Sequence, residues 1–437
     1  MKHLIIASLL LGATVSASAE VWTLDSCVNY AVSHNLSVKS AQLDLEKAHQ
    51  SVVEAKSRFL PTLSAGAAQN WDFGRGLTAQ NTYANRNTSS FGWNAQFSLP
   101  VFQGLSALRT LRQAQAAVPV SETRVRAARE EVTLGVLAYY LQALYTRSMV
   151  DVARENLALS EAQHARTLVL VEGGKVAEIE ALQAQSEVEQ NRLQLVQAEG
   201  DASLALVDLA QALQLPSAEG FQVDTLLSLP PDGNVPSVAD IYASALGTNA
   251  SIKAAAGQVE LARHAVSVAQ SGYLPRLNFN AGLGSTYYTL SGSDNPGFSR
   301  QMRDNFSRSL GFSISVPIFD AFNTRNQVRQ ARMQVRQADL ELERQRTQLY
   351  KSVEQAWQQT VNASASWQAA CRATEAARAA LDAMNEKYAY GRATLTETTE
   401  ARTNYANALA RLTQARYEHI LRARILGFYA DPSSILR

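Results

Sequence analysis

Residues 91–102 read Phe-Gly-Trp-Asn-Ala-Gln-Phe-Ser-Leu-Pro-Val-Phe, and apolar side chains occupy every second position as far as Leu99. A later stretch, residues 310–319, repeats the pattern as Leu-Gly-Phe-Ser-Ile-Ser-Val-Pro-Ile-Phe. Such alternation is typical of a β-strand with one apolar face. Strands of about ten residues with one apolar and one small or polar face suit the wall of an outer-membrane barrel. A soluble β-sandwich gives the same alternation, so the strands alone leave both open.

Two further alternating runs supply a partner for each of these strands. One covers residues 277–283, and a weaker one begins at Leu63 and reaches Phe73. We therefore expect one hairpin over residues 62–100 and a second over 276–317. Their tips are the polar connections 78–90 and 291–304.

The chain also contains one ordered set of landmarks twice. Asn35-Leu-Ser-Val-Lys39 returns as Asn249-Ala-Ser-Ile-Lys253, and the Leu-Pro pair at 60–61 returns at 274–275. Gly391-Arg392 follows Gly174-Lys175 by 217 positions. Ordered repetition indicates two structural repeats. We place them at residues 20–236 and 237–437, with a proline-rich linker between them.

Outside the hairpins the apolar period is helical. Long tracts cover residues 103–171 and 321–390, and at 1.5 Å per residue each spans roughly 100 Å. Leu349, Val353 and Ala356 follow coiled-coil spacing. Shorter helical tracts cover residues 28–59, 176–215, 252–273 and 393–428. Pro119 lies inside the first long tract, where we expect a kink or a boundary.

Composition narrows the class of protein. The 437 residues contain 40 Lys+Arg against 39 Asp+Glu, a balance that excludes a strongly basic nucleic-acid binder. Two cysteines exclude a disulfide scaffold and a cysteine-based zinc cluster. Residues 1–19 have a positive start, a short apolar core and a small-residue cleavage site, as a secretory signal peptide does. The mature chain is therefore expected outside the inner membrane.

Four strands cannot close a membrane barrel by themselves. Open sheet edges are not tolerated in hydrocarbon, and the smallest closed barrels use about eight strands. If the barrel interpretation holds, two, three or four copies must share one barrel. The arithmetic does not choose among these numbers.

Enzyme chemistry finds little support in the sequence. The six histidines show no metal-ligand spacing, and Gly173-Gly174-Lys175 lacks the upstream Gly and following Ser or Thr of a phosphate-binding loop. We predict no catalytic residue, no cofactor and no metal site.

One stretch carries a specific resemblance. Leu381-Asp-Ala-Met-Asn-Glu-Lys-Tyr-Ala-Tyr-Gly391, followed by Thr394 and Glu397, is similar to the helix–turn–helix tip of the TolC family of outer-membrane efflux proteins. The repeated helix–hairpin plan, the Leu-Pro joints and the signal peptide extend the resemblance over the mature chain.

The resemblance implies a mixed fold of α-helical coiled coil and transmembrane β-structure. Three chains would form a homotrimer with a twelve-stranded barrel in the bacterial outer membrane, surrounded by lipid and continued by a periplasmic α-helical barrel. The resemblance also implies the function, a passive export duct of a tripartite efflux or type I secretion system. The partners would be a periplasmic adaptor protein and an inner-membrane pump of the RND, ABC or MFS class. Without the resemblance, a periplasmic coiled-coil scaffold lacking a pore is the alternative.

The resemblance also assigns residues at the two turns. The adaptor would contact Gly174, Lys175, Val176, Ala177, Gly391, Arg392, Ala393 and Thr394. Tyr388 matches a tyrosine that holds the mouth closed in the family, and Arg392 stands one residue before the position of the family's gating arginine. Glu180, Glu397 and Glu400 would line the mouth and favour cations. The plainer interpretation is that these glutamates stabilise helix N-termini.

Overall fold

A computed structural model of the chain describes residues 21–77, 82–85, 87–224 and 235–431. The predicted signal peptide, part of the connection 78–90 and part of the linker between repeats lie outside the described residues. Two compact units divide the chain. The first contains residues up to 41, 125–250 and those from 346 onward, and the second contains residues 42–124 and 251–345.

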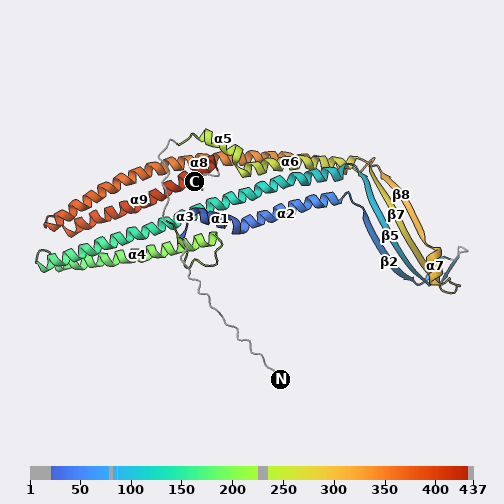
Figure 1. Cartoon of the computed structure of the whole chain (residues 1–437), viewed down its shortest axis with the longest axis horizontal. Coiled ribbons are helices and arrows are strands. Elements are labelled where there is room, and N and C mark those ends of the chain that lie inside the picture. Colours follow the sequence, from blue (N-terminus) through green and yellow to red (C-terminus); the bar gives the residue numbers. More distant parts are fainter. Residues whose placement is uncertain (1–20, 78–81, 86, 225–234, 432–437) are drawn as a thin grey trace, which may run out of the picture. The chain divides into compact units, whose positions relative to one another are not determined.

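A four-stranded antiparallel sheet lies in the second unit (Figure 1). Its strands, in spatial order, are β2 (Thr62–Asp72), β5 (Thr88–Gln103), β7 (Arg276–Leu290) and β8 (Ser307–Ser315). The two predicted hairpins are present as β2 with β5 and β7 with β8. The repeats join where β5 pairs with β7. Within the described residues, β2 and β8 each pair on one side only, so both margins of the sheet are open.

The outer strands carry apolar side chains that the rest of the chain does not cover. Every residue of β2 and of β8 is exposed. Leu310, Phe312 and Ile314 share one face of β8 and are 79%, 71% and 70% exposed. Exposed apolar surface of this kind marks an interaction with a membrane or another protein.

The strand β5 continues beyond Pro100, the residue at which we expected the first hairpin to end. It runs on to Gln103 with an irregular register between Pro100 and Phe102. Because proline has no N–H, it is tolerated in a sheet at such an irregularity. The connections at the hairpin tips also contain elements that we had not predicted: β3 (Arg75–Leu77), β4 (Tyr83–Asn85) and α7 (Phe298–Asp304).

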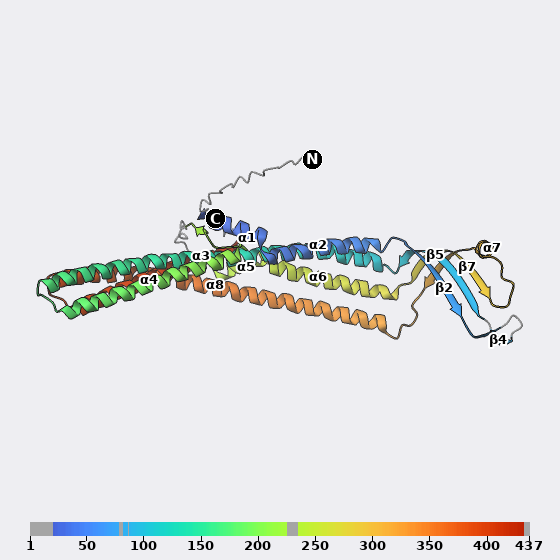
Figure 2. The ribbon, with the colours of Figure 1, turned by 90° about the horizontal axis from the view of Figure 1, so that it is seen from below.

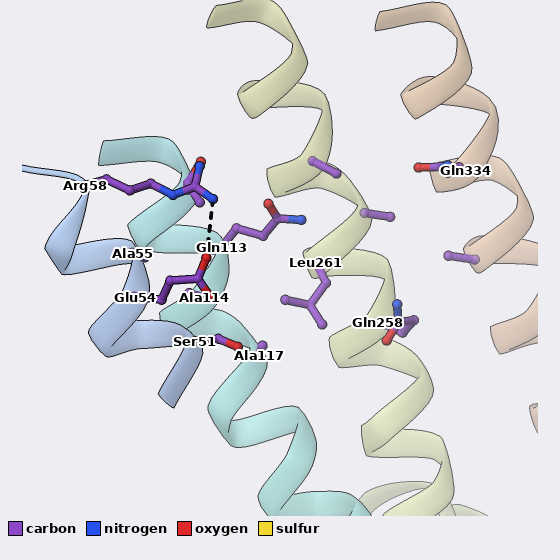
Figure 3. A pocket seen from close by; sticks show the side chains of 14 residues that line it. Ser51, Glu54, Ala55, Arg58, Gln113, Ala114, Ala117, Gln258, Leu261 and Gln334 are labelled. Carbon is purple, nitrogen blue, oxygen red and sulfur yellow. Dashed lines mark ion pairs between the residues drawn. The ribbon is translucent and has the colours of Figure 1, made fainter. Parts of the chain in front are cut away.

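Each strand of the sheet is continuous with one helix. The helix α2 (Leu36–Ser57) leads into β2, and β5 leads into α3 (Ser106–Glu172). The helix α6 (Ala250–Gln270) leads through the short 3-10 helix η1 (Ser271–Tyr273) into β7, while β8 leads into α8 (Asn323–Ala389). In the second unit the helices consequently lie in the order of the strands, α2, α3, α6 and α8 (Figure 3). None of the helices in the described ranges is both long and apolar enough to cross a membrane.

The expectation of a boundary at Pro119 was wrong, because α3 runs through this residue without ending. The next residue, Val120, is buried against α6 at Gly257, where an added Cβ would come within 2.5 Å of the valine side chain. Thr123 Oγ1 also donates to the Pro119 carbonyl at 2.7 Å. We attribute the continuity of α3 to the close packing of Val120 on Gly257, which offsets the lost backbone hydrogen bond.

The tract predicted as one helix over residues 28–59 is two helices. The first, α1 (Leu24–His34), ends at Asn35, whose extended backbone has ψ of 135°. Asn35 Oδ1 accepts from the Ser37 N–H at 2.8 Å and so caps α2. In the second repeat α5 (Val238–Thr248) ends in the same way at Asn249, with ψ of 122°. The repeated Asn motif thus marks a helix break.

The first unit is held by a helical core. It contains α1, most of α3 and α8, α4 (Glu178–Ala212), α5 and α9 (Leu395–Ala430), with β1 (Val21–Trp22) parallel to β6 (Gln222–Val223). Tyr140 is 1% exposed among the core side chains, and its hydroxyl donates to the Asp224 carbonyl at 2.8 Å. Because the buried hydroxyl has a hydrogen-bond partner, its burial costs little free energy. The bond connects α3 to the residue that follows β6.

Candidate functional site at the helix–helix tips

The turn between α3 and α4 and the turn between α8 and α9 lie at the same end of the first unit in both views (Figures 1 and 2). All the predicted docking residues belong to these two turns. These residues are exposed, apart from the half-buried Val176 and Ala393. The fold therefore brings together two segments separated by 217 positions in the sequence.

Both turns use the same backbone geometry. Gly174 and Gly391 have φ of 66° and 68°, a left-handed conformation that favours glycine. The Lys175 N–H bonds the Leu170 carbonyl and the Arg392 N–H bonds the Lys387 carbonyl, at 2.9 and 2.8 Å. This is the Schellman arrangement, which satisfies the last carbonyls of a helix. The two turns thus share one backbone geometry.

The helices that follow begin differently. Glu180 and Glu397 are both the third residue of their helix. Thr394 precedes α9 and forms a capping box with Glu397, whose Oε2 accepts from the Thr394 N–H at 2.7 Å and from its hydroxyl at 2.9 Å. Ala177 precedes α4 and offers no side-chain bond. Of these two equivalent glutamates, only the Glu397 carboxylate is held by the residue that precedes its helix, Thr394.

This cap gives the α9 tip a pH dependence. Hydrogen bonds from the Thr394 backbone N–H and then its hydroxyl hold the pKa of Glu397 below its ordinary 4.5. A carboxyl with a lowered pKa stabilises the folded state above its ordinary pKa, and the contribution is lost as pH falls through the folded value. We expect acidification to lower the protection of the amides in the first turn of α9, measured as exchange relative to the intrinsic rate at each pH.

Removal of the cap should have the same effect at neutral pH. Thr394→Ala is expected to cost about 1 kcal/mol locally, or roughly fivefold faster exchange of the amides at 395–398. Glu180→Gln is the control at the α4 tip, where only the weaker interaction with the helix dipole is lost, and should change exchange there less. Equal responses at the two tips would contradict the capping role of Thr394.

Tyr388 joins the two helical hairpins just before the α8 turn. It is 2% exposed, and its hydroxyl lies 3.2 Å from Thr167 Oγ1 on α3. Since the Thr167 hydroxyl donates to the Gln163 carbonyl at 3.0 Å, Tyr388 is the donor of this bond. The two predicted gating residues therefore lie in different surroundings. Tyr388 is buried between the hairpins, whereas the Arg392 side chain is exposed on the turn itself.

An ion pair and a second hydrogen bond also connect the hairpins, and we had predicted neither. Arg402 of α9 pairs with Glu187 of α4, and the two side chains are only 10% and 24% exposed. One turn further along α9, Tyr405 donates to Glu155 of α3 at 3.0 Å. Three polar contacts therefore cross from the first helical hairpin to the second near the tips.

A sequence signal for these contacts existed. Leu395, Thr398, Arg402 and Tyr405 follow the spacing of one helix face, and all four are buried. An arginine on an otherwise buried face needs an acidic partner. Nothing in the spacing identifies Glu187, which lies 215 residues away, as that partner.

The second unit contains a concave groove lined by residues of α2, α3, α6 and α8 and by Arg58, which follows α2 (Figure 3). Its volume is about 550 Å³, and most of its lining consists of Ala, Gln and Ser side chains. Arg58 and Glu54 form an ion pair at one side, with 3.8 Å between Arg58 Nη2 and Glu54 Oε1. Six of its fourteen lining residues are Ala, so much of the groove surface is apolar. No group of residues suited to holding a metal ion is found among the described residues.

The sheet is open and has exposed apolar rows, and each of its strands is followed or preceded by a long helix in both repeats. These features are typical of outer-membrane channels with a helical extension. The chain matches the family described as Outer membrane efflux protein over residues 28–214 and 241–424, and it belongs to that family, the TolC family.

Relatives match over most of their own length. The outer membrane efflux protein BepC of Brucella suis biovar 1 is 25% identical over 96% of this chain and 88% of BepC. The outer membrane protein TolC of Escherichia coli is 24% identical over 89% of this chain and 78% of TolC. The solved structure of VceC from Vibrio cholerae covers 94% of this chain and 96% of its own, with a TM-score of 0.77 at 15% identity.

Family membership settles the class of function. The family consists of outer-membrane channel proteins and not of enzymes. The chain is therefore an outer-membrane channel protein. The scaffold alternative finds no support in these comparisons.

Proposed function

We propose that the chain is one subunit of a homotrimeric export duct in the outer membrane. Three copies contribute four strands each to a closed twelve-stranded barrel, and their long helices continue it as an α-helical barrel in the periplasm. The duct is passive and serves a tripartite efflux or type I secretion system, with an inner-membrane pump supplying the energy. Residues 1–19 are the cleaved signal, and residues 20–236 and 237–437 are the two repeats.

The open sheet is the observation that carries this proposal. Both edge strands lack a second partner within the described chain, and their apolar faces are exposed. In hydrocarbon, unpaired backbone groups must find partners in another chain. Pairing of β8 in one copy with β2 in the next satisfies both edges. Purified protein should then give a stable conductance in planar bilayers, whereas fractionation as a soluble protein without conductance would contradict the duct.

The tips are the proposed docking surface for a periplasmic adaptor. Two Schellman turns at one end of the first unit contain Gly174, Lys175, Val176, Ala177, Gly391, Ala393 and Thr394. A cysteine placed at Val176 or Ala393 should crosslink to an adaptor from the same bacterium. A cysteine at Gln197, exposed in the middle of α4, is the control and should not.

The mouth beside these tips is proposed to prefer cations. Glu180, Glu397 and Glu400 lie in the first two turns of α4 and α9. Three copies would place nine carboxylates around one opening, and rings of acidic side chains attract cations. Replacing Glu397 and Glu400 together by Ala is expected to lower the cation-to-anion permeability ratio and the block by multivalent cations.

The matched control replaces Glu354 and Glu375, two exposed glutamates of α8, by Ala and removes the same charge elsewhere. An unchanged current–voltage relation in the Glu397 and Glu400 variant would remove both residues from the mouth. Tyr388, with Arg392 on the turn beside it, is proposed to hold the mouth closed through the Thr167 contact.

A further inference from the structure

The helix α8 begins with a stripe of four arginines. Arg325, Arg329, Arg332 and Arg336 follow spacings of four, three and four, which place them on one helix face. All four side chains are exposed, and residues 321–338 contain no Asp or Glu. In the part of the chain that the structure describes, no ion pair is found for Arg329, Arg332 or Arg336. The stripe therefore presents unneutralised positive charge.

The first repeat shows which way this face points. Gly104-Leu105 and Ala321-Phe322 are equivalent left-handed pairs, with φ of 61°, 63°, 52° and 63°. This register aligns the stripe with Leu108, Arg112, Gln115 and Pro119 of α3. All four of these residues are exposed, although α3 has α2 on one side and α6 on the other. The face is consequently not one that neighbouring helices cover.

The contacts of α3 confirm this orientation. Its side toward α6 carries Arg109, which bonds the Ser267 carbonyl at 2.7 Å, and Arg124, which bonds Gln258 at 3.2 Å. Its groove side carries Gln113, Ala114 and Ala117. At 100° per residue, the positions equivalent to the stripe lie opposite the groove. A second copy placed beside α8 would therefore leave the arginines uncovered on the convex outer face.

The stripe continues the apolar surface of the sheet. After β8 ends at Ser315, the side chains of Ile318, Phe319 and Phe322 are 95%, 74% and 55% exposed. The Arg325 guanidinium lies 5.6 Å from the Phe322 ring centre. Along the chain, an apolar strand is followed by aromatic residues and then by arginines. This is the order found across a membrane–water interface. The stripe extends about 17 Å along the helix and begins directly after the exposed aromatic residues, so its first turn lies nearest to the headgroup layer.

We propose that this arginine stripe binds the anionic headgroups of phospholipids in the periplasmic leaflet of the outer membrane. The inference rests on the proposed placement of the sheet in that membrane. Guanidinium groups pair with phosphate through two parallel hydrogen bonds, and rows of basic residues beside a membrane span bind anionic lipid. The equivalent face of the first repeat has one arginine, so the lipid contact belongs to the second repeat.

The test uses the purified full chain in detergent micelles, titrated with fluorescent phosphatidylglycerol and, separately, fluorescent phosphatidylcholine. We expect preference for phosphatidylglycerol, reduced by high salt. The variant R325Q/R329Q/R332Q/R336Q should lose about tenfold or more of that preference. Changing the same four positions to Lys should retain most of it. The control variant R126Q/R129Q/R372Q/R378Q removes four exposed arginines elsewhere and should bind as the unchanged protein does.

Equal losses in the stripe and control variants, or no preference in the unchanged protein, would overturn the lipid site. So would competition by inorganic phosphate as strong as that by lipid, or capture of an acidic protein in place of lipid. Conductance in phosphatidylcholine bilayers distinguishes failure of the lipid site from failure of the proposed export duct. A protein that conducts without lipid preference loses only the lipid site, whereas one that neither inserts nor conducts loses both.

Discussion

Replacing Arg402 by Met is expected to lower the free energy of unfolding by about 3 kcal/mol. The change leaves the carboxylate of Glu187, only 24% exposed, without its partner between α4 and α9. An uncompensated buried charge costs more than the ion pair had contributed. The same change removes one of the contacts between the two helical hairpins, so we also expect higher single-channel conductance.

Chemical denaturation of the purified protein measures the first effect. The matched control is Arg192→Met, because Arg192 also pairs with glutamates but its side chain is 53% exposed. That change should cost less than about 1 kcal/mol. Combining Arg402→Met with Glu187→Leu should recover most of the stability. If the Arg402 and Arg192 variants lose equal amounts, the buried pair does not hold the hairpins together.

Phe312→Lys is expected to abolish assembly in the outer membrane. Phe312 lies in the middle of the apolar row of β8 and is 71% exposed. A lysine on the lipid face of a barrel strand costs about 2–4 kcal/mol near the bilayer midplane. Because each barrel would contain three copies, the penalties accumulate within a single assembly. Less than about one tenth of the normal amount should remain in the outer-membrane fraction.

Ser313→Lys is the control for this change, since the next residue of β8 points to the opposite face of the sheet. This lysine would face the aqueous interior, so assembly should be normal and cation preference should fall. Loss of assembly in both variants would show that the two faces of β8 have the same surroundings, contrary to a barrel in lipid.

The sheet was predictable because its signal is local. Alternation at Phe91, Trp93 and Phe97 identifies a strand without knowledge of any other segment, and the repeat supplies its counterpart. The pairing of β5 with β7, which joins the repeats, was not predicted, since the pattern specifies faces and not neighbours.

Tertiary contacts decided the features that the sequence did not predict. Proline has a low helix propensity, so the sequence predicts a disturbed helix at Pro119. The packing of Val120 on Gly257 outweighs this low propensity. The Asn35 motif served as a landmark of the repeat, yet its capping bond to Ser37 makes it a helix break. At the tips, the glycine turns were evident from sequence. The spacing of Thr394 and Glu397 also fits the capping box that the structure shows, although the structural role that we assigned to Glu397 was only an interaction with the helix dipole.

The most direct test of the duct is disulfide formation between the two open edges of the sheet. In a background with Cys27 and Cys371 changed to Ser, Ser64→Cys on β2 is combined in turn with Ser309→Cys, Gly311→Cys or Ser313→Cys on β8. Opposed residues on paired strands have Cβ atoms about 4.5–5.5 Å apart, close to disulfide geometry. Oxidation in outer membranes should give a ladder of covalent species ending at three chains in one of these registers. Only disulfides within single chains, or no disulfide in any register, would contradict the shared barrel.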